Sequence, residues 1–185
     1  VVIGVGNVAV DVARILSKTV QELGETDIAE YALESLKESK VREVYMLGRR
    51  GPLQAAFTNP EVRELGSLEE TEAVTYPREI ELDEHSRKQI EEKDDHSARK
   101  KIEILESYSG GRPDSAKKRK LHFRFLVSPV EFLGDEKGRL RAVKVVKNVL
   151  YKSEDGSIRS RPTGEFEEIE AGLVFRSIGY HGHPL

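Results

Sequence analysis

The sequence predicts an α/β fold in which helices pack on a central parallel sheet and a small antiparallel β-meander is added. Three observations predict it. The chain opens with VVIG, typical of a short buried strand, which runs directly into a glycine turn and an amphipathic helix. Strand and helix patterns then alternate along the first half of the chain, and after residue 120 the apolar residues recur at every second position. One domain over residues 1–185 accommodates all of these elements.

The composition excludes several kinds of protein. The 185 residues are 37% hydrophobic and 34% charged, carry a net charge of -3 and include no cysteine. Disulfide bonds, cysteine-ligated zinc, iron–sulfur clusters and thiol nucleophiles are therefore excluded, so a redox role would need a bound organic cofactor. The net charge gives no reason to expect nucleic-acid binding, and no apolar run approaches the ~20 residues of a membrane span. No signal-type segment precedes Val1, which favours a cytosolic or matrix-type compartment, and a cytoplasmic location is expected.

The first helix is predicted from the spacing of its apolar residues. After the strand over residues 1–4, helical spacing relates Val8, Val12, Ile15 and Leu16. The chain is therefore expected to form a strand, a tight glycine turn and a helix.

A second helix, a strand and a short helix follow in the sequence. The second helix is predicted over residues 26–39, with Asp27 as its N-cap. The segment REVYMLGRR alternates as a strand does. In NPEVRELGSL, a short helix is expected to have Asn59 as its cap and Pro60 at its first position.

The second half of the chain is predicted to be richer in strands. EAVTYP is expected to be the third strand, residues 83–107 are heavily charged, and GGRPDSAKKRK is expected to be a loop. Residues 121–151 predict an antiparallel hairpin that is joined at GDEKG. GEFEEIEAG and LVFRSIG are expected to close the chain as two more strands.

The glycine turn has the pattern GxGxxA, which is typical of dinucleotide binding. Gly4 permits a tight turn, Gly6 leaves space for a pyrophosphate, and Ala9 lets the helix pack on the strand. The N–H groups at the start of such a helix point at the phosphates. Sites for FAD, NAD, NADP and methyl donors all use versions of this pattern, and glycines at a strand end can simply form a turn. The flanking strand and helix favour nucleotide binding in a Rossmann-like domain.

Two arginines at the end of the second strand indicate which nucleotide would bind. Sites that prefer NAD place an acid about 20 residues after the glycines, whereas NADP sites place arginine there to bind the 2′-phosphate. Arg49 and Arg50 occupy this position, and each can present a guanidinium fork to a phosphate monoester. The helix over residues 26–39 accounts for the longer spacing. A solvated basic turn is the alternative interpretation.

Four motifs together resemble a known family. In order and spacing, GxGNVAxDVARIL, GRRGPLQAAFT with NPEVREL, FRFLVSPVE and RSIGYxGxPL resemble the NADP-binding domain of adrenodoxin reductase-type ferredoxin–NADP⁺ reductases. The resemblance extends over essentially the whole chain, and the extra helix resembles that of bacterial members. In the family this domain is an insert in a flavin-binding domain. The resemblance therefore implies an excised domain that binds NADP(H) for hydride exchange with FAD held by the absent domain, and that catalyses nothing alone.

The resemblance also assigns roles to single positions. The positions that it assigns to cofactor binding are Gly4, Gly6, Asn7, Val8, Ala9, Arg49, Arg50 and Glu61. Glu61 matches a family residue near the nucleotide, although the helix dipole also favours an acid in the first turn of a helix. Asp11 and Glu64 match positions on the flavin side and are the catalytic candidates of the parent enzyme. Each could equally be an ordinary exposed carboxylate.

The resemblance implies an acidic, ferredoxin-like electron carrier as partner. The basic residues that match docking positions of the family are Arg63, Arg99, Lys100 and Lys101. A solvated helix face is the competing interpretation, because several acids directly precede the last three. His181 and His183 lack carboxylate neighbours in the sequence, so no metal site is predicted.

Two other functions stay open from the sequence. A stand-alone regulatory module that senses NADP(H) would need no flavin partner. A reductase domain of the glutamate synthase small-subunit type shares the fold and the glycines, but the segment GRRGPLQAAFT argues against it.

Overall fold

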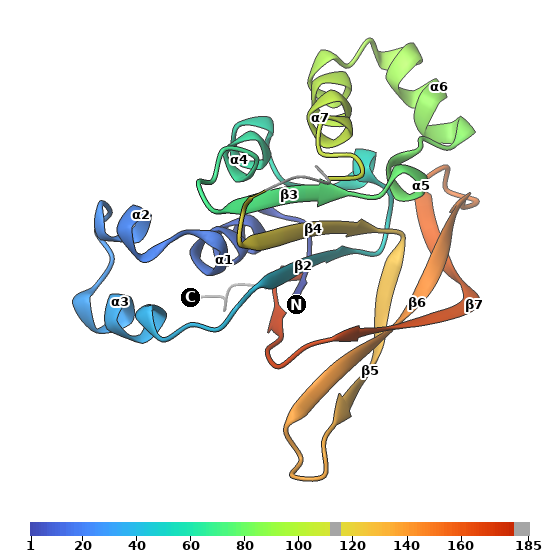
Figure 1. Cartoon of the computed structure of the whole chain (residues 1–185). Helices are drawn as coiled ribbons and strands as arrows, with labels where there is room; N and C mark the ends of the chain where they lie inside the picture. The colour runs from blue at the N-terminus through green and yellow to red at the C-terminus, as the bar shows by residue number, and fades with distance from the viewer. Residues whose placement is uncertain (112–115, 180–185) are drawn as a thin grey trace, which may run out of the picture.

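The computed structural model describes residues 1–111 and 116–179, which form two sheets and the helices around them (Figure 1). The larger sheet is parallel, with the strand order β3-β4-β2-β1-β8. The smaller sheet is antiparallel, with the order β5-β6-β7. The predicted fold, a parallel sheet with an added β-meander, is therefore confirmed. No helix within these two ranges is long and apolar enough to cross a membrane.

The elements alternate along the chain much as the sequence patterns do. The parallel sheet consists of β1 (Val2–Ile3), β2 (Glu43–Gly48), β3 (Thr71–Thr75), β4 (Arg119–Phe125) and β8 (Phe175–Arg176). The antiparallel sheet consists of β5 (Val127–Gly134), β6 (Leu140–Lys152) and β7 (Ile158–Glu170). The helices are α1 (Asn7–Ser17), α2 (Val20–Gly24), α3 (Glu30–Lys37), the 3₁₀-helix η1 (Pro52–Gln54), α4 (Asn59–Leu65), α5 (Pro77–Ile80), α6 (Glu84–Lys93) and α7 (His96–Glu106).

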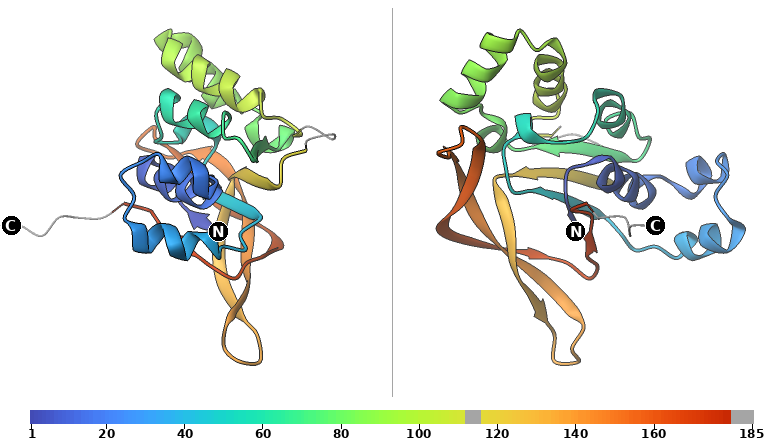
Figure 2. Two further views of the ribbon diagram at one scale, coloured as in Figure 1. Left: turned by 60° about the vertical axis from the view of Figure 1, so that its left-hand side comes forward. Right: turned by 180° about the vertical axis from the view of Figure 1, so that it is seen from behind.

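The two faces of the parallel sheet are covered differently (Figure 2). Helices α1, α4 and α7 pack on one face, in a core that includes Met46 of β2 and Phe123 of β4. The antiparallel sheet packs on the other face, where Leu47 meets Val143 and Val145. Adjacent strand residues point to opposite faces, so Met46 and Leu47 contribute to separate cores.

Helix α1 packs on the sheet through its smaller residues. Ala9, Val10 and Ala13 are fully buried. Val8 and Ile15, two of the apolar residues whose spacing predicts the helix, are 57% and 40% exposed. Small side chains let the helix come close to the sheet, so the packed face follows them rather than the largest apolar residues. The predicted helix is therefore confirmed.

The insertion between α1 and β2 contains two short helices instead of one. Thr19 caps α2, because its hydroxyl accepts the N–H of Glu22 at 3.1 Å and its own N–H donates to the Glu22 carboxylate at 2.7 Å. Helix α3 begins after Ala29, so the prediction of Asp27 as a cap is wrong. A Thr-x-x-Glu capping box satisfies two backbone groups at once and therefore starts a helix earlier than the apolar pattern indicates.

Helix α4 begins one residue earlier than predicted. Thr58 is its N-cap, and both the N–H and the hydroxyl of Thr58 bond to the Glu61 carboxylate, at 3.3 and 2.8 Å. Asn59, the predicted cap, is the first helical residue and donates its amide to the Ser97 carbonyl at 2.9 Å. Pro60 is therefore the second helical residue.

The charged segment over residues 83–107 forms α6 and α7. Both helices begin at an aspartate: Asp83 accepts the N–H of Ser86 at 3.2 Å, and Asp95 accepts the N–H of Ala98 at 2.9 Å. Leu105 of α7 is fully buried in the main core. Helix α7 is thus held on the sheet, whereas Ile90 of α6 packs in a separate small cluster with Ala98 and Ile102 of α7.

The antiparallel sheet begins later than predicted and is larger. Residues 121–125, expected in a hairpin over residues 121–151, belong to β4, which lies between β2 and β3 in the parallel sheet. The chain changes sheets at Leu126, which has a positive φ of 57°. Three adjacent apolar residues, Phe125, Leu126 and Val127, interrupt the alternation here, but an apolar run does not by itself indicate that the chain changes sheets. Strand β7 then pairs with β6 over almost all of its length.

A buried arginine joins the two sheets. Arg124 of β4 is 5% exposed; its Nε donates to both oxygens of Glu79, at 2.9 and 3.1 Å, and its Nη atoms donate to Glu167 at 2.9 and 2.8 Å. The guanidinium lies 4.7 Å from the ring centroid of Tyr76. Burial opposes the charged form of Arg124, but the hydrogen bonds to the two carboxylates outweigh it and raise the pKa of the guanidinium. Strand β4, α5 and β7 are thereby held together.

Replacing Arg124 with methionine should lower the free energy of unfolding by about 2–4 kcal/mol, because Glu79 and Glu167 lose their shared cation. Urea unfolding followed by circular dichroism measures the change. Arg141→Met is the matched control: Arg141 pairs with Glu168 at 3.3 Å, and both side chains are 52% exposed. The control should change stability by less than about 0.5 kcal/mol. Equal losses in the two variants would contradict the role given to Arg124.

Candidate functional site

The glycine turn after β1 is fixed by the neighbouring strand β8. Gly4 has a φ of +136°, and a Cβ at this position would lie 2.0 Å from the carbonyl oxygen of Ser177. The Gly4 N–H donates to the Leu47 carbonyl of β2 at 3.0 Å. No side chain fits at Gly4, because both the conformation and the space require glycine.

The second glycine of the turn faces open space. Gly6 is the N-cap of α1, with φ -104° and ψ 177°, and no atom of the described residues lies within 4 Å of a Cβ placed there. The first backbone bond of α1 runs from the Val10 N–H to the Gly6 carbonyl at 3.1 Å. Within the described ranges no side chain caps this terminus, and the first turn of α1 has no acid. The N–H groups before Val10 are therefore available to an anion.

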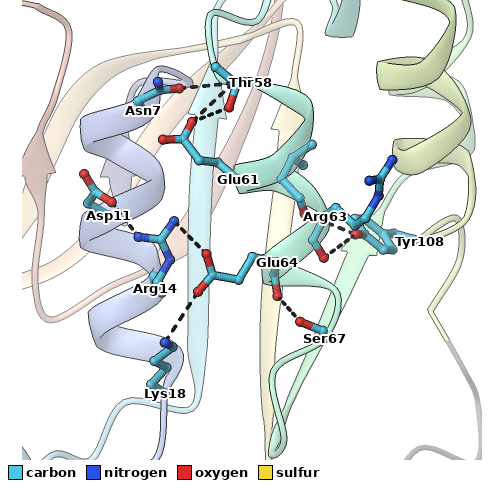
Figure 3. A network of polar contacts seen from close by, with 11 residues as sticks. Asn7, Asp11, Arg14, Lys18, Thr58, Glu61, Arg63, Glu64, Ser67 and Tyr108 are labelled. Atoms are coloured by element: carbon cyan, nitrogen blue, oxygen red, sulfur yellow. Dashed lines mark hydrogen bonds and ion pairs between the residues drawn. The ribbon is translucent and has the colours of Figure 1, made fainter. Parts of the chain in front are cut away.

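Asn7, the first residue of α1, connects the glycine turn to α4. Its Oδ1 accepts the N–H of Thr58 at 3.1 Å, and Thr58 is the cap of α4 that also bonds to Glu61 (Figure 3). The structure thus brings Asn7 and Glu61, both expected near the nucleotide, to the same cap. The Glu61 carboxylate serves as a capping group here. Its contact with a nucleotide stays a prediction.

The two expected arginines follow the end of β2. Arg49 and Arg50 are exposed and line a hollow of about 430 Å³. Residues at and near the antiparallel sheet fix the backbone of both arginines. The side-chain amide of Asn148 donates to the Arg49 carbonyl at 2.9 Å, and the N–H of Leu126 donates to the Arg50 carbonyl at 3.1 Å. The side chains are free for solvent or a ligand while the backbone beneath them is fixed.

Asn148 of β6 is a site residue that the sequence reasoning missed. It is 6% exposed and sits at a register shift between β6 and β7. Besides the bond to Arg49, its amide donates to the Ser128 hydroxyl at 2.8 Å, and its backbone N–H donates to the Leu126 carbonyl at 2.7 Å. The sequence contains one signal for this role. In KVVKNVL, residues 144–150, Asn148 is an amide side chain within an otherwise largely apolar strand, and a buried amide needs hydrogen-bond partners.

Asp11 and Glu64, the catalytic candidates, belong to one ion-pair network across α1 and α4 (Figure 3). Arg14 of α1 donates to Asp11 at 2.6 Å and lies 3.2 Å from a Glu64 oxygen. Lys18 lies 3.5 Å from the other oxygen of Glu64. The network ties the two helices together, and the two carboxylates remain 58% and 44% exposed. Their part in catalysis stays a prediction.

Lys101, one of the expected docking residues, is turned into the protein. Its Nζ donates to the Ala55 carbonyl at 2.6 Å and lies 5.7 Å from the centroid of the Phe57 ring. Burial lowers the pKa of this amino group. In this conformation Lys101 holds α7 against the segment that follows η1.

The other expected docking residues lie on α4 and α7. Arg99 pairs with Asp94 at 2.8 Å, and Lys100 pairs with Glu103 at 2.7 Å. Arg63 is exposed on α4, near Tyr108 (Figure 3). The four cations thus differ in their surroundings, and a contact with a partner protein stays a prediction for each.

A larger cavity lies away from the glycine turn. Its volume is about 1050 Å³, and it opens between the two sheets beside Arg124, Tyr45 and Tyr76. The charged group at its centre, Arg124, is paired with Glu79 and Glu167. Burial raises the pKa of Tyr76 to about 12. Arg124, Glu79 and Glu167 neutralise one another in this cavity. We therefore place the candidate functional site at the smaller hollow beside Arg49 and Arg50.

His181 and His183, together with the end of the motif RSIGYxGxPL, lie outside the described residues. Across residues 1–111 and 116–179, no group of three or more histidine and acidic side chains could hold a metal ion.

Comparison with known proteins gives the relatives of this chain. No family model matches it. The whole chain aligns at 42% identity with the NADPH-ferredoxin reductase FprA of Mycobacterium tuberculosis and at 38% with the mitochondrial NADPH:adrenodoxin oxidoreductase of Arabidopsis thaliana. The human mitochondrial NADPH:adrenodoxin oxidoreductase is 36% identical. The chain spans about two fifths of the length of these relatives, 39%, 39% and 38%.

A solved structure of Mycobacterium tuberculosis FprA in complex with NADPH matches 99% of this chain. Its TM-score is 0.88 at 40% sequence identity, and the match covers 39% of that protein. The family resemblance of the four sequence motifs is therefore confirmed: this chain is homologous, along its whole length, to one part of the adrenodoxin reductase-type ferredoxin–NADP⁺ reductases.

Proposed function

We propose that this chain binds NADP(H), with the pyrophosphate over the glycine turn and the 2′-phosphate at Arg49 and Arg50. The observation that carries the proposal is the position of the two turns. They follow β1 and β2, which are adjacent parallel strands, with Val2 opposite Met46. Both turns therefore lie at the edge where the carboxyl ends of these strands meet, which is the edge at which open α/β sheets bind ligands. The NADPH complex of the homologous FprA supports this assignment.

The residues at this edge fit such a nucleotide. Space is open at Gly6, and the first N–H groups of α1 have no side-chain cap within the described ranges. A dinucleotide phosphate needs close backbone approach and unpaired N–H donors, which this turn supplies. Arg49 and Arg50 add two cations after the adjacent strand β2, where guanidinium groups could bind a phosphate monoester. The turn thus fits the diphosphate and the arginines fit the third phosphate.

We further propose that the nucleotide exchanges a hydride with FAD bound by the rest of a longer reductase. The chain's own part is to bind the nucleotide and orient its nicotinamide. Asp11 and Glu64 are the candidate residues on the flavin side, and a ferredoxin-like acidic protein is the candidate electron carrier. Exposed Arg63 and the paired Arg99 fit the docking of such a carrier better than the inward Lys101. A cytoplasmic location is part of the same proposal.

Replacing both Arg49 and Arg50 with alanine should weaken NADP⁺ binding by about 2–4 kcal/mol, because charge-assisted bonds to one phosphate are lost. NAD⁺ lacks this phosphate, so its affinity should stay nearly unchanged. The unchanged protein should prefer NADP⁺ by at least about tenfold. Isothermal titration calorimetry with both nucleotides measures these differences. Equal affinities of the unchanged protein for NADP⁺ and NAD⁺ would refute the assignment.

The two glycines should respond differently to substitution. Gly6→Val should abolish NADP⁺ binding with a nearly unchanged melting temperature, since valine can adopt this φ and ψ but fills the space of the pyrophosphate. Gly4→Ala should lower the free energy of unfolding by about 2–4 kcal/mol, because of the positive φ and the contact with Ser177. Calorimetric melting and nucleotide titration on the same preparations test both. A folded Gly6→Val protein that still binds NADP⁺ would exclude the role proposed for the turn.

A further inference from the structure

The hollow beside Arg49 and Arg50 has a second wall, which the β6–β7 hairpin supplies. The lining residues from the hairpin are Tyr151, Ser157, Ile158, Arg159 and Ser160. The hairpin reaches back to the edge where β2 and β4 end (Figures 1 and 2). It is in contact with the arginine turn, because a Cβ at Gly51 would lie 3.3 Å from a methyl group of Leu150.

The lining of this hollow is strongly cationic. Three of its seven lining residues are arginines, namely Arg49, Arg50 and Arg159, and two are serines. No carboxylate is among the lining residues in the described part of the chain. An anion placed between guanidinium groups that line one hollow would be stabilised.

We propose that the tip of the β6–β7 hairpin is part of the binding site for the 2′-phosphoadenosine end of the nucleotide. Arg159 contacts the 2′-phosphate as a third cation, and the Tyr151 ring contacts the adenine. This inference rests on the NADP(H) binding proposed above. The ligand class is thus a purine nucleoside that carries a phosphate monoester on its ribose.

Arg159 is able to accept a phosphate with little rearrangement. Its Nη2 donates to Asp155 at 2.6 Å and its Nε to the Ser157 hydroxyl at 3.2 Å, while Nη1 makes no hydrogen bond to any described residue. The Arg159–Asp155 pair is exposed, at 57% and 55%, and exposed pairs contribute little to stability. Release of Arg159 would leave Asp155 anchored, because Asp155 also accepts bonds from the N–H and the hydroxyl of Ser157, at 2.9 and 2.7 Å.

Tyr151 lies directly opposite Arg159 in the antiparallel register. Its ring is half-buried, and the Arg161 guanidinium lies 5.7 Å from the ring centroid, which restricts the ring's orientation. An aromatic ring attracts a purine base whether or not the ribose carries a phosphate. The two residues therefore make separable contributions: Arg159 to the phosphate and Tyr151 to the base.

The test compares 2′,5′-ADP with 5′-AMP as probes, since they differ in the 2′-phosphate. By calorimetric titration, Arg159→Gln should weaken 2′,5′-ADP binding about three- to tenfold and leave 5′-AMP binding unchanged, because only an exposed charge-assisted contact is lost. Tyr151→Leu should weaken both probes by a similar factor.

The tip of the β5–β6 hairpin offers a matched control. Arg139 pairs there with Asp135 at 2.9 Å, at the same four-residue spacing as Arg159 with Asp155, but it does not line the hollow. Arg139→Gln removes the same charge from the protein and should bind both probes as the unchanged protein does. All three substitutions are at strand or turn positions with exposed or half-buried side chains, and melting temperatures confirm that the variants are folded.

The outcomes separate this inference from the function on which it rests. If Arg159→Gln binds 2′,5′-ADP as tightly as the unchanged protein, or if Arg139→Gln loses affinity equally, the role of the hairpin tip is overturned. The Arg49 and Arg50 double substitution then still decides NADP(H) binding. If that double substitution leaves 2′,5′-ADP binding unchanged while Arg159→Gln weakens it, the proposed placement of the phosphate fails and the hairpin tip alone holds it.

Discussion

The positive φ of Leu126 is the constraint on which the rest of the structure depends. At this residue the chain leaves the parallel sheet and enters the antiparallel one. A left-handed conformation is unfavourable for leucine by about 1 kcal/mol or more, so surrounding bonds must hold it. The N–H of Leu126 is bound to Arg50 and its carbonyl to Asn148. Leu126 and Asn148 also bond to the backbone of Arg50 and Arg49. The hydrogen bonds at the change of sheet therefore also fix the position of the two arginines.

The charged residues of this chain fall into two groups with different uses. Arg124, between the sheets, is saturated by two carboxylates and serves to hold β4, α5 and β7 together. Arg49 and Arg50 have fixed backbone and exposed side chains. A cation can bind a ligand strongly only if its own partners do not already satisfy it. Burial and pairing therefore separate structural cations from candidate binding cations in a sequence that is rich in both.

Local chemistry could be predicted from the sequence, whereas contacts between distant segments could not. The glycine turn, the helix after it and the arginines at the end of β2 follow from residue type and short spacing, and the structure places them as expected. Thr58 is the cap in place of Asn59 because Glu61 stands three residues after it, and this capping-box spacing is visible in the sequence. The break at Leu126 coincides with an apolar run, residues 125–127, but such a run does not indicate that the chain enters a second sheet. The inward position of Lys101 and the contact between the β6–β7 hairpin and the arginine turn depend on tertiary packing.

The pairing of β1 with β8 has a consequence for how this protein folds. Val2 pairs with Phe175, near the opposite end of the sequence, whereas β5, β6 and β7 pair with their immediate neighbours along the chain. Strands that are neighbours along the chain pair early, because only a short loop has to close. Strands that are distant along the chain pair late, because closing a long loop costs more conformational entropy. The contact between Ser177 and Gly4 depends on the pairing of β1 with β8 and therefore forms late. The glycine turn therefore reaches its final geometry only after this distant pairing has formed, and before that the proposed nucleotide site is incomplete.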